Sequence, residues 1–169
     1  MGRDRKNEKR GEHFAKLVRT MMEAPAWRAL SPVAQALYPW LKMEWHGPNA
    51  NNNGKIRLSI QQAADRLGVN PKTAMRAFHE LQEKGFIVVT EGARLGVGGV
   101  AKSPALELTE IPTLGAVGQH GRRLYLEWRP GHDFPVMRAN VNNPYGAQGK
   151  AKSQSKKGNG AIPLFGTKG

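Results

Sequence analysis

Residues 58–87 carry the start and stop signals of two short helices that only a tight turn separates. Ser59 is a typical N-cap residue, and Gln62, three positions later, completes a capping box. Gly68 is a typical C-terminal stop, because glycine adopts the left-handed backbone conformation without strain. This spacing predicts a helix over residues 60–67.

A second helix is predicted directly after the turn. Asn70-Pro71 is a cap residue followed by proline at the first helical position, and Gly85 ends the segment. Between them the apolar residues recur at helical spacing, which predicts a helix over residues 71–84 with one buried face. The residues expected on that face are Ala74, Ala77, Phe78 and Leu81.

Further helices and strands are predicted before and after these two helices. Ser31-Pro32 starts a helix that ends by His46, and the face expected to be buried carries Val33, Leu37, Trp40 and Leu41. Alternation predicts a short strand over residues 55–58. Two further strands, 86–90 and 105–109, flank a Gly-rich loop over residues 92–104. The expected fold class is α+β, a winged helix-turn-helix with a three-helix core plus a β-hairpin wing, over residues 31–110.

The central stretch resembles the DNA-binding domain of GntR-type regulators and the helix-turn-helix domains of phage and plasmid replication proteins. The matching positions are Ala64, where the helices cross; Leu67 and Val69, around the turn; Thr73-Ala74, Ala77-Phe78 and Leu81, in the second helix; and Gly85-Phe86-Ile87. With its flanking elements the resemblance covers about half of the chain, and it implies binding of double-stranded DNA. Pro71 departs from the family, which often has a basic or polar residue there.

The outer face expected for the second helix carries side chains that suit DNA, because the N-terminal half of such a helix reaches base edges in the major groove. Arg76 can bind a guanine through two hydrogen bonds, and Lys72 suits a phosphate or a guanine. Thr73 suits a base edge or a phosphate, and Asn70 places backbone donors near a phosphate. Residues of the preceding helix start and of the wing complete the predicted DNA-binding set: Ser59, Gln61, Asn70, Lys72, Thr73, Met75, Arg76, His79, Arg94 and Lys102.

Composition favours the same partner. The chain has 26 Lys and Arg against 13 Asp and Glu, a formal net charge of +13, which favours nucleic acid over an anionic membrane or an acidic protein. Without cysteine it has no disulfide and no thiol chemistry, and its five histidines are scattered. We therefore predict a protein that is not an enzyme, has no catalytic residue, metal or cofactor, and is cytoplasmic and associated with the nucleoid.

Residues 96–101 match a dinucleotide-binding fingerprint, but Lys102-Ser103-Pro104 follows where that motif needs a helix.

The remaining segments are expected to extend this domain. Residues 1–12 are predicted to be a disordered basic arm, and residues 13–30 an extra N-terminal helix and linker that Pro25 interrupts. The helix has an apolar stripe that either packs on the domain or forms a homodimer: Phe14, Leu17, Val18, Met21 and Met22. Residues 111–129 are expected to form a short C-terminal extension: an irregular Gly/Pro stretch over residues 111–121, then residues 122–129, which fit a helical turn or a strand equally well.

Residues 130–169 are rich in Pro, Gly and Lys, and we expect a disordered basic tail. Its apolar island, residues 161–166, is either tail or a motif that binds a protein partner. No segment has the length of a membrane span. The predicted function is transcriptional regulation, and the alternatives are origin binding for plasmid or phage replication and a winged-helix adaptor that binds a protein.

Overall fold

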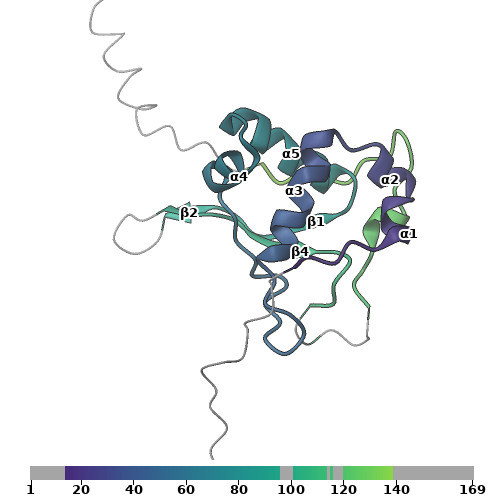
Figure 1. Ribbon diagram of the computed structural model, residues 1–169, viewed down its shortest axis with the longest axis horizontal. Helices are drawn as coiled ribbons and strands as arrows, with labels where there is room; N and C mark the ends of the chain where they lie inside the picture. The colour runs from purple at the N-terminus through teal and green to yellow at the C-terminus, as the bar shows by residue number, and fades with distance from the viewer. Residues whose placement is uncertain (1–13, 96–100, 114, 116–119, 139–169) are drawn as a thin grey trace, which may run out of the picture. The chain divides into compact units, whose positions relative to one another are not determined.

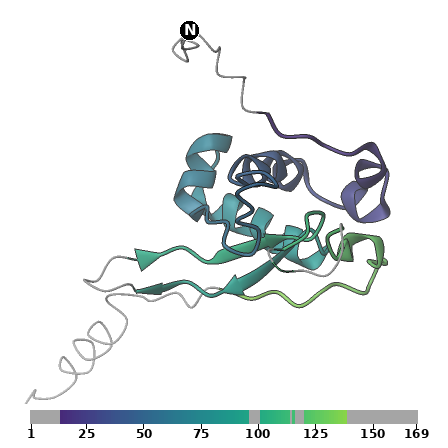
Figure 2. The same ribbon diagram turned by 90° about the horizontal axis from the view of Figure 1, so that it is seen from below.

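The computed structural model describes residues 14–95, 101–113, 115 and 120–138 (Figure 1). These residues combine helices with a two-stranded antiparallel sheet, so the expected α+β class is confirmed. The helices lie mainly on one side of the hairpin that the sheet forms (Figure 2). The predicted arm at residues 1–12 and the apolar island at residues 161–166 lie outside the described residues.

The capping signals stand where the sequence predicts them. The three longer helices are α3 (Pro32–Met43), α4 (Ile60–Leu67) and α5 (Pro71–Glu83). Each begins with a side-chain cap, and at Ser59 both halves of the capping box are formed, because its hydroxyl accepts from the Gln62 N–H and its own N–H donates to the Gln62 side chain. Gly68 ends α4 with φ 65°, in the left-handed region. These predictions are confirmed.

The hairpin is longer than its predicted strands. β1 (Ile87–Glu91) pairs antiparallel with β4 (Ala105–Leu108). Beyond them β2 (Arg94–Leu95) pairs with β3 (Ala101–Lys102), so the predicted Gly-rich loop is partly strand. We call the β2–β3 pair the hairpin arm; it extends past the helices in Figure 2.

The strand predicted over residues 55–58 is reduced to one bridge, in which Ile56 pairs with Leu106 of β4. Gly54, with φ 91°, turns the chain immediately before this bridge, and Ser59 caps α4 immediately after it. Because the turn and the helix start are so close in sequence, pairing with β4 is limited to the two bonds between Ile56 and Leu106 and one from the Gly54 N–H to the Leu106 carbonyl at 3.2 Å. The two apolar residues of the segment, Ile56 and Leu58, are both in the core, whereas Lys55 is exposed.

The single N-terminal helix predicted before Pro25 is wrong. Residues 14–18 are not helical, and two one-turn helices follow, α1 (Arg19–Met22) and α2 (Pro25–Arg28). Pro25 lacks the N–H that would continue α1, and its fixed φ lets it start α2 instead. The apolar stripe is therefore split: Met21 is fully buried, whereas Phe14 is 79% exposed.

The face that α3 turns inward also differs from the prediction. Leu37 and Leu41 are buried as expected, but Trp40 lies outside, 38% exposed, with the Arg66 guanidinium 5.3 Å from its ring centroid. Tyr38 and Lys42 are buried in its place because they have a partner in the interior. That partner is Glu110, whose carboxylate accepts from the Tyr38 hydroxyl and the Lys42 ammonium, both at 2.9 Å.

Four aromatic rings join the helices to the hairpin and to the C-terminal segment. Trp27, Tyr38 and Phe86 meet edge to face with centroids 5.5–5.7 Å apart. Tyr125 stacks on Phe86 at 4.9 Å. Tyr125 belongs to a 3₁₀ turn, η2 (Leu124–Leu126), so of the two alternatives for residues 122–129 the structure has the helical turn.

Residues 130–138, which the sequence assigns to the tail, lie against the end of α5. The Phe134 N–H donates to the Glu83 carbonyl at 2.9 Å. The Asp133 carboxylate accepts from the Lys84 ammonium at 2.5 Å and from the Trp128 indole at 2.7 Å. These donors lower the pKa of Asp133, with the Lys84 hydrogen bond as the largest cause. The folded domain therefore includes residues 130–138.

Candidate nucleic-acid interface

The turn between α4 and α5 fixes how the second helix is presented. After Gly68, the Val69 N–H donates back to the Ala64 carbonyl at 3.0 Å, which closes the end of α4. Ala64 and Ala74 are both buried where the two helices pack, and such small side chains let the backbones approach closely. The helix α5 therefore has one face committed to the core: Ala74, Ala77, Phe78 and Leu81, all buried as predicted.

The opposite face of α5 carries the predicted contact residues. Lys72 and Arg76, one helical turn apart, are exposed, and Thr73, Met75 and His79 beside them are partly exposed. Among the described residues no carboxylate lies within 4.0 Å of the charged groups of Lys72 and Arg76. Within the described part of the chain, these two cations have no counter-ion, which leaves them accessible to an external anion.

The caps decide which groups at the helix starts are free. The Asn70 side-chain oxygen Oδ1 accepts from the Thr73 N–H at 2.9 Å and from the Thr73 hydroxyl at 3.1 Å. The Thr73 hydroxyl hydrogen is therefore used in a bond within the protein. In this conformation the hydroxyl oxygen can accept a hydrogen bond from a base but cannot donate one. Pro71 has no N–H, so the first backbone donor of α5 is that of Lys72.

At the start of α4, too, some of the polar side-chain groups already have hydrogen-bond partners within the protein. The Ser59 hydroxyl accepts from the backbone N–H of Gln62 at 3.1 Å, so its own hydrogen is left to donate. Gln61 is exposed, and its amide donates to Asp65 at 2.8 Å. Both residues lie at the N-terminal end of α4, and both keep a polar atom for an outside partner.

The two predicted cations of the hairpin face each other across the arm. Arg94 of β2 pairs with Lys102 of β3 in the ladder, and both side chains are exposed. Arg94 is not free, because its guanidinium lies 2.7 Å from the Glu91 carboxylate. Eight of the predicted residues thus lie on α4, on α5 or at their N-caps, whereas Arg94 and Lys102 lie on the hairpin arm.

Sequence reasoning missed Arg57, which shares Glu91 with Arg94. The Arg57 guanidinium donates to the Glu91 carboxylate and to the Ser103 carbonyl. These partners are 34 and 46 positions away in sequence, so no local pattern signals them. Arg57 joins the segment before α4 to both sides of the hairpin, at the place where the arm begins.

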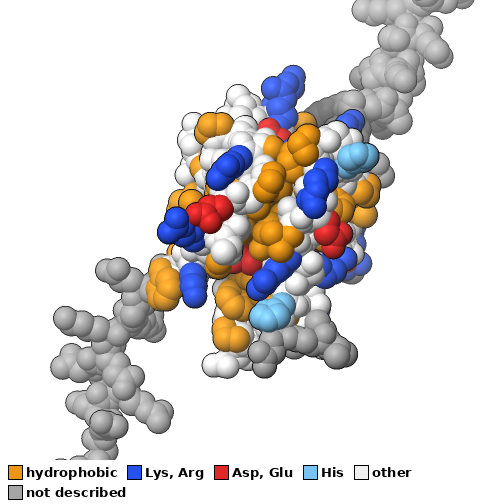
Figure 3. Space-filling view, turned by 90° about the vertical axis from the view of Figure 1, so that its right-hand side faces the viewer, with side chains coloured by type: hydrophobic (Ala, Val, Ile, Leu, Met, Phe, Trp, Pro, Cys, Tyr) orange, Lys and Arg blue, Asp and Glu red, His pale blue; other side chains and the backbone are white. Residues whose placement is uncertain are grey.

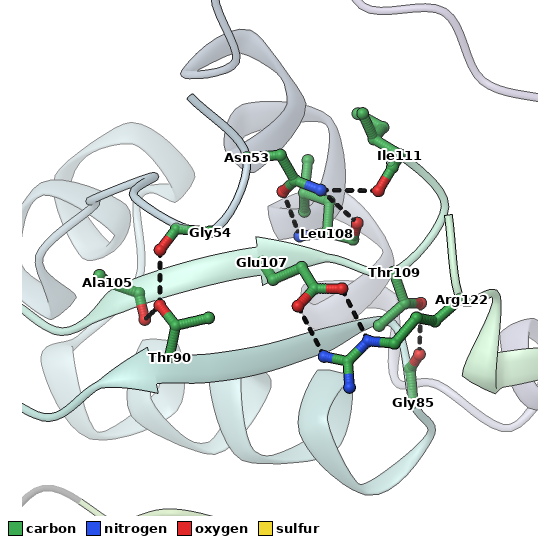
Figure 4. Close-up of polar contacts among 10 residues, drawn as sticks. All are labelled: Asn53, Gly54, Gly85, Thr90, Ala105, Glu107, Leu108, Thr109, Ile111 and Arg122. Atoms are coloured by element: carbon green, nitrogen blue, oxygen red, sulfur yellow. Dashed lines mark hydrogen bonds and ion pairs between the residues drawn. The ribbon is translucent and has the colours of Figure 1, made fainter. Parts of the chain in front are cut away.

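A set of buried polar contacts holds the base of the hairpin (Figure 4). Glu107 of β4 is only 5% exposed and accepts from the Arg122 guanidinium at 2.8 and 2.6 Å. This hydrogen bonding raises the pKa of Arg122, and burial opposes the shift in part. Thr109 donates its hydroxyl to the Gly85 carbonyl at 2.7 Å, next to the end of α5. The Thr109 bond links the base of the hairpin to the end of α5.

Asn53 makes the corresponding contacts on the other side of β4 (Figure 4). Its amide donates to the carbonyls of Leu108 and Ile111, at 3.0 and 2.7 Å, and its oxygen accepts from the Leu108 N–H at 2.8 Å. At the bulge in β1, the Thr90 hydroxyl lies 2.6 Å from the Gly54 carbonyl oxygen and 3.1 Å from that of Ala105, and its one hydrogen can donate to either. The loop that leads into α4 is therefore tied to both strands of the hairpin.

The face made by α1, α2 and η2 has a different character, and it lies away from α4 and the hairpin arm in Figure 1. Hydrophobic side chains form a band across it, with Lys and Arg side chains on both sides (Figure 3). Met22 of α1 and Leu126 of η2 are 41% and 50% exposed. This face suits contact with a protein better than contact with a polyanion.

Other kinds of site find no support in the part of the chain that the structure describes. No group of three or more His, Cys, Asp or Glu side chains could hold a metal ion there. No described helix is long and apolar enough to cross a membrane. Comparison of the chain with protein-family models, with curated proteins and with solved structures finds no match.

Proposed function

We propose that this protein binds double-stranded DNA through α5, with the fold of a winged helix-turn-helix domain. The observation that carries the proposal is the division of α5 into two faces. One face is buried in the core, and the other presents Lys72 and Arg76, neither of which has a counter-ion among the residues that the structure describes. A helix exposed in this manner fits the major groove of B-DNA.

The order of elements supports the same proposal. α3, the bridge at Ile56, α4, a tight turn, α5, β1 and β4 follow one another as in winged helices. In this arrangement α5 is the recognition helix and the hairpin arm is the wing. Arg76 and Lys72 contact bases and phosphates, and Lys102 on the arm contacts a neighbouring phosphate or the minor groove.

The biological role that we propose is transcriptional regulation. Origin binding in plasmid or phage replication uses the same interface chemistry, and the location of the bound sites separates the two roles. Enrichment of promoter fragments in a selection from genomic DNA supports regulation, whereas enrichment of repeated elements at an origin supports initiation of replication.

The proposal is tested by fluorescence-anisotropy titration of mixed-sequence duplex DNA at several salt concentrations. Loss of the two helix cations in K72A/R76A is expected to weaken binding at least about tenfold and to reduce the slope of log K against log salt by up to about two. The matched control is K16A/R28A, which removes the same charge from exposed positions of the N-terminal segment. Equal losses in the two double variants, or no binding by the wild type at low salt, would refute an α5 interface.

A second candidate function is binding of a protein, as an adaptor or as a homodimer. The exposed apolar band across α1, α2 and η2 favours it. Sedimentation velocity of the wild type and of M22S/L126S, with and without DNA, is the test. A dimer that dissociates in M22S/L126S while DNA binding persists would assign this face to self-association.

A further inference from the structure

Glu91 lies at the outer end of β1 between two arginines. One of its carboxylate oxygens accepts from Arg57, and the other lies 2.7 Å from the Arg94 guanidinium. We propose that Glu91 occupies in the free protein the place that a DNA phosphate takes in the complex, so that this carboxylate sets the affinity of the interface. The inference rests on the proposed DNA binding.

The position of the three side chains makes them accessible to an outside anion. Arg57 and Glu91 are 33% and 35% exposed, and Arg94 is 60% exposed. The buried pair of Lys42 and Glu110, at 7% and 10%, is closed to solvent by comparison. The arginines therefore lie at the surface where the hairpin arm begins, close to the exposed Lys102 of the neighbouring strand.

The chemistry of the guanidinium group makes the exchange possible. A carboxylate and a phosphate both offer two oxygens to the planar fork of an arginine, so either one satisfies it. Ion pairs at this level of exposure are weak, because water and salt screen them. A duplex that carries many phosphates can therefore displace a single carboxylate, although Glu91 then lies beside the DNA and repels it.

Arg57 has a second bond that the exchange does not disturb. Its guanidinium also donates to the Ser103 carbonyl, on the other side of the hairpin. When the carboxylate leaves, this bond keeps Arg57 in place at the base of the arm. Removing the charge of Glu91 is thus expected to free two arginines without releasing the arm.

The variant E91Q tests this inference by anisotropy titration of the full chain with duplex DNA. Its binding is expected to be about fivefold tighter than that of the wild type, and the slope of log K against log salt to steepen by about one to two, since each added phosphate contact contributes about 0.9. E91D keeps the charge and is expected to behave like the wild type. The matched control is E44Q, because Glu44 pairs with Arg66 at 2.5 Å and both are about one third exposed, at 31% and 32%.

E91Q in an R57A/R94A background separates two causes of tighter binding. One is the replacement of the Glu91 carboxylate by a DNA phosphate at the two arginines, and the other is the loss of simple repulsion between Glu91 and the DNA. The gain of E91Q must disappear in that background, because the arginines that it frees are absent. An equal gain in that background or in E44Q, or weaker binding by E91Q whose urea midpoint is unchanged, overturns the inference. If the wild type binds no DNA, the proposed function itself is overturned. If the wild type binds DNA and E91Q binds it with the same affinity and salt dependence, only the role of Glu91 is overturned.

Discussion

Replacing Asn53 with alanine is expected to destabilise the domain by about 3 kcal/mol. Asn53 is 4% exposed and makes three hydrogen bonds to the backbone around β4, at 2.7–3.0 Å. Each such bond contributes about 1 kcal/mol net, and alanine leaves one buried N–H and two carbonyls without this partner. For a domain of this size the loss corresponds to a fall in melting temperature of roughly 10 °C.

Urea unfolding followed by tryptophan fluorescence measures this loss, and the control is N49A in the same Asn-rich loop, where Asn49 is exposed. N49A is expected to change the unfolding free energy by less than about 0.5 kcal/mol. N53D gives a second measure: its carboxylate can still accept from the Leu108 N–H but faces the Leu108 and Ile111 carbonyls, so its stability should rise as the pH falls and the carboxylate protonates. A loss below about 1 kcal/mol in N53A would refute the reasoning, since it would mean that the loop satisfies these groups without Asn53.

Two further predictions concern the core. Burial, and then the Glu110 carboxylate, raise the pKa of the Tyr38 phenol well above 10.0, so the neutral phenol stabilises the fold below about pH 10 and this contribution is lost as the pH rises further. Y38F removes that titration, and its unfolding free energy should fall less between about pH 9 and 11 than that of the wild type; equal falls would contradict the assignment. G85A is expected to cost about 3 kcal/mol or more in urea unfolding, because Gly85 has φ 76° and an added Cβ would lie 2.7 Å from the Phe134 ring and 2.9 Å from the Leu124 carbonyl carbon. G47A is its control, since Gly47 has φ 86° but no atom within 4 Å of the added Cβ, and equal losses would show that the backbone strain alone matters.

The parts of the fold that the sequence predicts are those whose cause is local. A cap residue, a capping box and a stop glycine act within one turn of chain, and all of those around α4 and α5 stand as predicted. The buried face of α5 follows from spacing alone. The prediction failed where a local pattern competes with distant partners: Tyr38 and Lys42 are turned inward by Glu110, about 70 positions away, and Trp40 is turned outward.

In the candidate site, too, the features with a local cause are visible in the sequence, and those that depend on distant partners are not. The exposure of Lys72 and Arg76 follows from the period of the helix and is visible in the sequence. The pairing of Glu91 with Arg57 depends on how the hairpin meets the segment before α4, and no nearby residue signals it. The attachment of residues 130–138 to α5 also depends on tertiary contacts, since their composition is that of a tail.

The division of α5 into two faces bears on how proteins with this fold can diverge. The inner positions are constrained by packing, and a change at Ala74 or Leu81 alters the whole core. The outer positions, such as Lys72 and Arg76, contribute little to folding, so mutation can replace them at almost no loss of stability. A lineage with this scaffold can therefore acquire new ligand preferences by drift on one helical surface, and swapping those few outer residues between relatives should transfer the preference with them.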